Sequence, residues 1–96
     1  MLVAEVDRRV AGFVTLGTRV HFTGEIDAYV GELVVAATAQ GRGVGRSLVA
    51  AAEAWARERG LSRITLETGA ANSAARAFYA ALGFAEDDVR LTRTLP

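Results

Sequence analysis

The hydrophobic pattern of the first 35 residues is typical of β-strands. Residues 2–6 and 10–16 are rich in apolar and β-branched side chains and are separated by the polar residues 7–9, which predicts a hairpin with a short turn. Residues 17–27 show no sustained period and predict a loop. Residues 28–35 alternate again and predict a third strand. We expect the first strand to lie at an edge of the sheet.

Between residues 43 and 59 the pattern changes to that of an amphipathic helix. Apolar residues recur at spacings of three and four along one stripe, and Gly60 is expected to end the helix. Trp55 is the largest residue of the stripe, and we expect it to anchor the core. The stripe consists of Val44, Leu48, Ala52 and Trp55.

The last third of the chain predicts a strand, a second helix and a terminal strand. Residues 61–68 alternate, and a strand that follows a helix predicts a parallel crossover from the preceding strand. Asn72 is placed to cap the second helix and Gly83 to end it. Residues 84–95 predict a terminal strand with an abbreviated strand before it. The apolar stripe of the second helix is Ala75, Phe78 and Leu82.

This order of elements predicts an α/β (α+β) fold with a mixed sheet. Antiparallel N-terminal strands are followed by strand, helix, strand, helix and strand. Much of the 51% hydrophobic content is alanine, which adds little apolar area to a core. We therefore expect a small core that depends on few large side chains.

Charge and composition exclude several classes of function. The 96 residues carry 11 basic and 11 acidic side chains, so no global field favours nucleic acid or an anionic membrane as a partner. With no cysteine and one histidine, we expect no disulfide, no thiolate catalysis and no metal site. No apolar run approaches a membrane span, and the first residues lack the pattern of a signal peptide. We expect a cytoplasmic protein.

A glycine-rich loop joins the third strand to the first helix. Gly41, Gly43 and Gly45 alternate with Arg42 and Val44, and glycine removes side chains where the first backbone N–H groups of a helix have no partner. Arg46 follows and adds a second guanidinium group beside that of Arg42. The loop therefore predicts a site for a phosphate or pyrophosphate.

The spacing of the loop decides between known phosphate-binding motifs. A Walker loop requires glycine at Gln40 and lysine at Arg46, and a dinucleotide fingerprint fails at its third glycine. The pattern Gln40-x-x-Gly43-x-Gly45 instead resembles the acetyl-CoA-binding motif of the GNAT superfamily of N-acetyltransferases. Residues 72–84, Asn-Ser-Ala-Ala-Arg-Ala-Phe-Tyr-Ala-Ala-Leu-Gly-Phe, resemble a second motif of the same superfamily.

The resemblance covers nearly the whole chain but only the later portion of the family's domain. It implies that residues 1–96 form a single truncated GNAT-like domain that lacks the usual first strand and first two helices. It also implies acetyl-CoA as cosubstrate, no metal, and a bulge near residues 34–36 where Val34 and Val35 contact the pantetheine arm. The further cofactor-binding residues implied are Gln40, Gly41, Arg42, Gly43, Val44, Gly45, Arg46 and Asn72.

The resemblance also implies the catalytic groups. Tyr79 corresponds to the tyrosine that protonates the departing thiolate, although the same ring is also explained as one of an aromatic pair on a packed helix. Glu67 resembles a glutamate that acts as base through ordered water, and Glu32 is a second candidate. Each carboxylate is equally explained as a solvated strand residue. His21 is expected to be a solvated loop residue, with a role as proton shuttle as the alternative.

The activity implied is transfer of an acetyl group from acetyl-CoA to a primary amine of a small molecule or protein, by direct attack in a ternary complex. Two alternatives remain open: a non-catalytic CoA-binding module and a structural module that dimerises. A sheet without the early helices exposes apolar surface, and pairing of two chains buries it. We therefore expect a homodimer.

Overall fold

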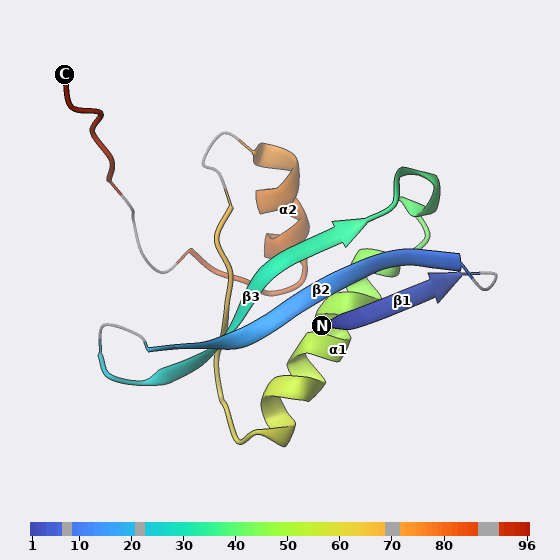
Figure 1. Ribbon diagram of the computed structural model, residues 1–96, viewed down its shortest axis with the longest axis horizontal. Helices are drawn as coiled ribbons and strands as arrows, with labels where there is room; N and C mark the ends of the chain where they lie inside the picture. Colours follow the sequence, from blue (N-terminus) through green and yellow to red (C-terminus); the bar gives the residue numbers. More distant parts are fainter. Residues whose placement is uncertain (7–8, 21–22, 69–71, 87–90) are drawn as a thin grey trace.

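The computed structural model describes residues 1–6, 9–20, 23–68, 72–86 and 91–96. Strands and helices follow one another along the chain in the order that Figure 1 shows. Residues 7–8 of the predicted turn, the connection at residues 69–71 and His21 lie outside the described residues. The elements are β1 (Leu2–Val6), β2 (Arg9–Val20), β3 (Ile26–Val35), the short 3-10 helix η1 (Ala37–Ala39), α1 (Val44–Glu58), β4 (Ile64–Thr65) and α2 (Ser73–Ala81).

The four strands form one mixed sheet in the order β1-β2-β3-β4. The first three are antiparallel neighbours, and β4 lies parallel to β3 after the crossover through α1. The edge position of β1 and the mixed α/β fold class are thus confirmed. Helix α1 packs across one face of the sheet, and the strands cross in front of it in Figure 1.

The lengths of three strands differ from the prediction. β2 continues to Val20 and β3 begins at Ile26, so the predicted loop at residues 17–27 is wrong at both ends. Thr18, Arg19 and Val20 pair across to Ala28, Asp27 and Ile26, because backbone pairing holds these residues extended without an alternating pattern. β4 covers only Ile64–Thr65 instead of residues 61–68.

The core lies between α1 and the sheet and consists mostly of small side chains. Its buried residues from the strands include Val14 and Val30, and Leu48 is the largest of those from the helix. The prediction that Trp55 anchors this core is wrong. The buried stripe continues at a spacing of four to Ala56, which leaves Trp55 half-buried on the flank, where the Arg59 guanidinium lies 4.1 Å from its ring centroid.

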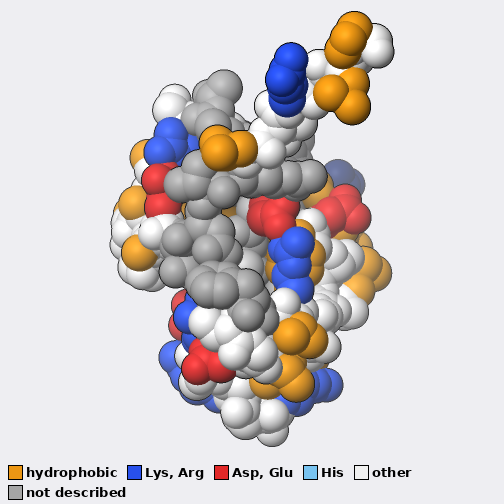
Figure 2. All heavy atoms as spheres, turned by 90° about the vertical axis from the view of Figure 1, so that its left-hand side faces the viewer, with side chains coloured by type: hydrophobic (Ala, Val, Ile, Leu, Met, Phe, Trp, Pro, Cys, Tyr) orange, Lys and Arg blue, Asp and Glu red, His pale blue; other side chains and the backbone are white. Residues whose placement is uncertain are grey.

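The predicted terminal strand is not formed in the described part of the C-terminal segment. Residues 91–96 have no regular structure, and Leu91 and Leu95 are 89% and 78% exposed. Figure 2 shows the end of the chain standing clear of the body with hydrophobic side chains in view. A strand needs a partner to satisfy its backbone groups, and the short β4 offers little edge for pairing. Residues 87–90 lie outside the described part.

Candidate functional site

The start of α1 has the backbone conformation of an anion-binding loop. Gly43 is the N-cap residue and Gly41 precedes it, and both have a left-handed conformation, with φ of 77° and 81°. No described side chain caps this helix end, and the first turn carries no acidic residue. The first N–H groups of α1 are therefore left for a ligand. The flanking side chains of Gln40, Arg42 and Arg46 are exposed.

Strand β3 leads to this loop along an edge that β4 leaves open. The two strands pair only through Ala28 with Ile64 and Tyr29 with Thr65. Beyond Tyr29, no described strand pairs with β3 on this side, although β2 continues on the other side as far as Val35. The predicted ligand residues Val34 and Val35 thus lie on a strand end whose outer edge no described strand pairs with, the position from which main-chain groups can bind an extended ligand.

The bulge in β3 lies earlier than the resemblance implies. Thr15 pairs with Glu32 and Leu16 with Val30, so Gly31 is the extra residue, and residues 34–35 pair regularly. The Glu32 N–H donates instead to the Thr15 hydroxyl at 2.8 Å. Glycine is needed here because a Cβ at Gly31 would lie 2.7 Å from that oxygen.

Helix α2 brings the second motif to the start of α1. Its N-cap prediction is confirmed, since the Asn72 Oδ1 accepts the Ala75 N–H at 3.1 Å. The ring of Phe78 packs against the first turn of α1, where a Cβ on Gly45 would lie 3.1 Å from Phe78 Cζ. The side-chain amide of Asn72 has a second, donating end, so capping and ligand binding are compatible.

Tyr79 sits in an aromatic cluster beside this contact. Its ring meets those of Phe78 and Phe84 edge to face, with centroids 5.1 Å and 5.6 Å apart. Burial among these rings raises the pKa of the Tyr79 phenol above its ordinary value. The phenol therefore remains protonated at neutral pH and can donate a proton or hydrogen bond.

The two candidate bases share the face of the sheet opposite α1. Alternation through the Gly31 bulge puts Tyr29 and Glu32 on that face, because Val30 and Leu33 pack toward the α1 core. Glu67 follows β4 and forms an ion pair with Arg19, whose guanidinium lies 4.8 Å from the centroid of the Tyr29 ring. The Glu32 side chain is exposed.

Comparison with known proteins settles the family. Residues 1–84 match the model of the acetyltransferase (GNAT) family. The chain is a GNAT protein. Both resemblances drawn from the glycine-rich loop and from residues 72–84 are thereby confirmed at the level of the family.

Individual relatives support the same assignment and differ from this chain in length. An aminoglycoside N(6')-acetyltransferase type 1 from Klebsiella aerogenes is 33% identical over 90 residues, which cover 90% of this chain and 59% of that protein. A putative acetyl transferase from Pyrococcus furiosus has a TM-score of 0.88 at 27% identity, over 97% of this chain and 63% of that structure. The GNAT chain described here thus spans about three fifths of either relative.

A third likeness concerns the fold alone. The structure of AAC(6')-Iy in complex with the bisubstrate analog CoA-S-monomethyl-acetylneamine has a TM-score of 0.82 at 24% identity, over 98% of this chain and 67% of that structure. The strands and helices of the present GNAT chain are thus arranged as in a protein that accommodates a CoA derivative.

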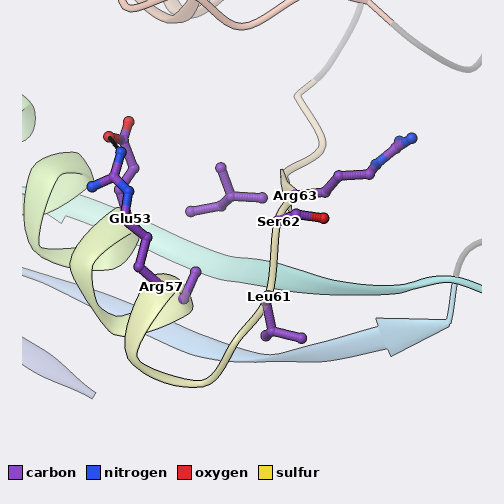
Figure 3. A pocket seen from close by; sticks show the side chains of 7 residues that line it. Glu53, Arg57, Leu61, Ser62 and Arg63 are labelled. Atoms are coloured by element: carbon purple, nitrogen blue, oxygen red, sulfur yellow. Dashed lines mark ion pairs between the residues drawn. The ribbon is translucent and has the colours of Figure 1, made fainter.

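A hollow elsewhere on the GNAT chain takes no part in this arrangement. It has a volume of about 250 Å³ and lies between the C-terminal half of α1 and the segment that leads to β4. Figure 3 shows Glu53 and Arg57 on the helix side and Leu61, Ser62 and Arg63 on the other. None of the predicted site residues lines it.

Two further features bear on cofactors and on the membrane. Within the described residues there is no cluster of three or more histidine, cysteine, aspartate or glutamate side chains that could hold a metal ion. Among the helices in that part of the GNAT chain, none has the length and apolar character to cross a membrane.

The sequence patterns did not predict that Arg19 and Tyr29 lie beside the candidate base Glu67. Arg19 fell in the predicted loop, so no face of a strand could be assigned to it. Nothing in its local sequence indicates that it reaches Glu67, 48 residues away in the chain. The pairing of β2 with β3 and of β3 with β4 would have been needed to find it, since together they place a guanidinium group, an aromatic ring and a carboxylate on one face.

Proposed function

We propose that this GNAT chain transfers an acetyl group from acetyl-CoA to a primary amine of a small molecule or protein. The observation that carries the proposal is the junction of β3 and α1. There a strand edge with no partner among the described strands leads into a helix start whose N–H groups have no described cap. An extended pantetheine arm fits the edge, and a pyrophosphate fits the helix start between Arg42 and Arg46.

The proposed chemistry is direct attack in a ternary complex. The amine nitrogen attacks the thioester carbonyl, the C–S bond breaks, and the departing thiolate takes a proton from Tyr79. Glu67 or Glu32 accepts the proton that the amine loses, so charge and protons balance. Family membership supports a role of this kind for Tyr79, and burial keeps its phenol in the protonated form that a proton donor needs. No metal takes part in the proposed steps.

Binding of acetyl-CoA is the first test. Calorimetry should show acetyl-CoA and CoA binding more tightly than NAD or ATP, because the loop spacing fits neither a Walker nor a dinucleotide motif. Gly43→Val should weaken CoA binding by about tenfold or more, as expected when hydrogen bonds to a charged phosphate are lost. Equal or tighter binding of NAD would contradict the proposal.

Gly24→Val is the matched control for this variant. Gly24 also has a left-handed conformation, with φ of 91°, and also has open space where a Cβ would lie, so both variants carry similar backbone strain. Gly24 lies in the connection between β2 and β3, away from the start of α1. Retention of CoA affinity by both variants would show that the cradle is elsewhere.

A turnover assay then distinguishes an acetyltransferase from a non-catalytic CoA-binding or structural module. Acetyl-CoA should be consumed with a primary amine present, and mass spectrometry should identify the acetylated product. Binding of acetyl-CoA without turnover would instead identify a CoA-binding module. We also propose a cytoplasmic location, which the absence of cysteine from the sequence supports.

A further inference from the structure

Three neighbouring strands bring one cation, one aromatic ring and one carboxylate together on the face opposite α1. Tyr29 of β3 pairs with Gly17 of β2 on one side and with Thr65 of β4 on the other. Arg19 lies two residues beyond Gly17, and Glu67 lies two residues beyond Thr65. The Arg19 side chain reaches across Tyr29, 4.8 Å from its ring centroid, to pair with the Glu67 carboxylate.

An aromatic face beside a carboxylate is a binding set for a cation. The ring attracts a cation through its quadrupole, and the carboxylate adds a charged hydrogen bond. The charged hydrogen bond from Arg19 to Glu67 accordingly raises the pKa of the guanidinium. The side chains of Arg19 and Glu67 are 51% and 42% exposed, so solvent weakens the pair and another cation can compete for it.

A second ion pair on this face has a buried carboxylate and contrasts with the exposed pair of Arg19 and Glu67. The Arg63 Nε lies 3.2 Å from Oδ1 of Asp27, whose side chain is only 3% exposed. The other oxygen of Asp27 accepts a hydrogen bond from the Thr65 hydroxyl at 3.2 Å. The Asp27 carboxylate is thus buried beneath this pair between β3 and β4, whereas both partners of the Arg19 pair are exposed to solvent.

We propose that Tyr29 and Glu67 form a subsite for a charged group of the acceptor, and that Arg19 occupies this subsite until the acceptor displaces it. The proposal rests on the proposed function and narrows its acceptor. The attacking nitrogen must be neutral, so the cation held at Tyr29 and Glu67 is a second group of the same molecule. The acceptor class is therefore a diamine or polyamine, and Glu32 becomes the favoured base.

Binding of small amines to the intact chain tests this subsite. The probes are 1,4-diaminobutane and, as a single-charge comparison, 1-aminobutane, each titrated with detection by NMR. Arg19→Gln should tighten binding of 1,4-diaminobutane by about two- to fivefold, the range expected when an exposed competing ion pair is removed. Binding of 1-aminobutane should change less. Circular dichroism would check that the variants are folded.

Arg59→Gln is the matched control. Arg59 also lies over an aromatic ring, that of Trp55, at 4.1 Å, but at the C-terminal end of α1. The Arg59→Gln variant removes the same charge as Arg19→Gln, so a general effect of net charge on diamine binding would appear in both variants. An equal gain in both variants, or no gain with Arg19→Gln, would overturn the proposal.

Glu67→Gln completes a double-mutant cycle with Arg19→Gln. It should weaken binding of 1,4-diaminobutane, and it should abolish the gain produced by Arg19→Gln when the two are combined. A gain that persists in the double variant would overturn the proposal, as would the absence of diamine binding to the unmodified chain. Acetyl-CoA binding, measured on the same preparation, tests the proposed function separately. A failure to bind acetyl-CoA would contradict the proposed function but not the diamine subsite. A failure to bind the diamine would contradict the subsite but not the proposed function.

Discussion

Tyr79 combines a packing role with a proposed chemical one in a single side chain. Its ring contacts Phe78 and Phe84, while its hydroxyl is the proposed proton donor. Tyr79→Phe keeps the ring and removes only the hydroxyl. We expect the fold and CoA affinity to persist while turnover falls by about 10²-fold or more, as for the loss of a general acid. Steady-state rates and calorimetry on the same preparation would measure both quantities.

The opposite outcomes for Tyr79 are equally informative. Loss of thermal stability with an unchanged rate per folded molecule would make the tyrosine a packing residue. An unchanged rate together with unchanged stability would mean that Glu67, Glu32 or water, and not Tyr79, supplies the proton to the thiolate. Phe84→Leu serves as the control for the aromatic cluster, because it alters the packing around Tyr79 and leaves the phenol in place.

At the scale of the residue, local sequence patterns indicated the family but not which side chains contact one another. The loop motif and the motif of residues 72–84 are visible as letters and were sufficient for the family. The contact of Arg19 with Glu67 depends on the pairing of three strands. The half-burial of Trp55 follows from the buried stripe of α1, which continues to Ala56 instead. Neither distance along the chain nor hydrophobicity specifies such contacts.

At the scale of the element, the cap of α2 separates two roles of Asn72. Asn72→Asp keeps an oxygen that can accept the Ala75 N–H but removes the amide donor. If that donor binds the pantetheine arm, CoA affinity should fall while thermal stability is retained. Asn72→Ala should lower both, with a loss of about 0.5–2 kcal/mol in unfolding free energy. Calorimetry and chemical denaturation would measure the two effects.

The control for Asn72 is an N-terminal position of α2 that does not cap it. Ser73 is exposed and follows the cap, so Ser73→Ala should leave both quantities nearly unchanged. If Asn72→Asp binds CoA as well as the unmodified chain does, the amide of Asn72 is a cap alone.

Elements differed in how well the sequence predicted them, for a physical reason. Helices depend on local hydrogen bonds, caps and a period of 3.6 residues, so α1 and α2 fell within a residue or two of their predicted bounds. Strand lengths depend on partners elsewhere in the chain. Residues 61–68 alternate correctly, yet only Ile64–Thr65 pair, and the bulge at Gly31 depends on the hydroxyl of Thr15.

At the scale of the whole molecule, we propose that residues 1–96 act as one acetyltransferase-like domain, and we expect it to be a homodimer. Val3 and Val34 are 47% and 43% exposed on the sheet, and Leu91 is exposed in the C-terminal segment. Burial of such side chains against a second chain favours association. Light scattering should give twice the monomer mass at micromolar concentration.

Two variants would locate the interface of this dimer. Val3→Glu should dissociate it if the sheet contributes the contact, and Leu91→Glu should do so if the C-terminal segment does. Glu58→Gln, at the solvent-exposed end of α1, is the control and should leave the mass unchanged. A stable monomer at micromolar concentration would contradict the expectation.

The two-residue pairing between β3 and β4 has a consequence for how the molecule opens. The segment from β4 through α2 joins the antiparallel strands through the pairing of Ala28 and Tyr29, a few hydrogen bonds and the ion pairs of Asp27 and Arg19. Sparse contacts of this kind favour local unfolding before the rest of the fold. We expect amide protons of α2 to exchange with solvent earlier than those at the centre of β2. A cofactor bound between the two parts would slow that exchange in proportion to its occupancy, so its affinity includes the work of holding the segment closed.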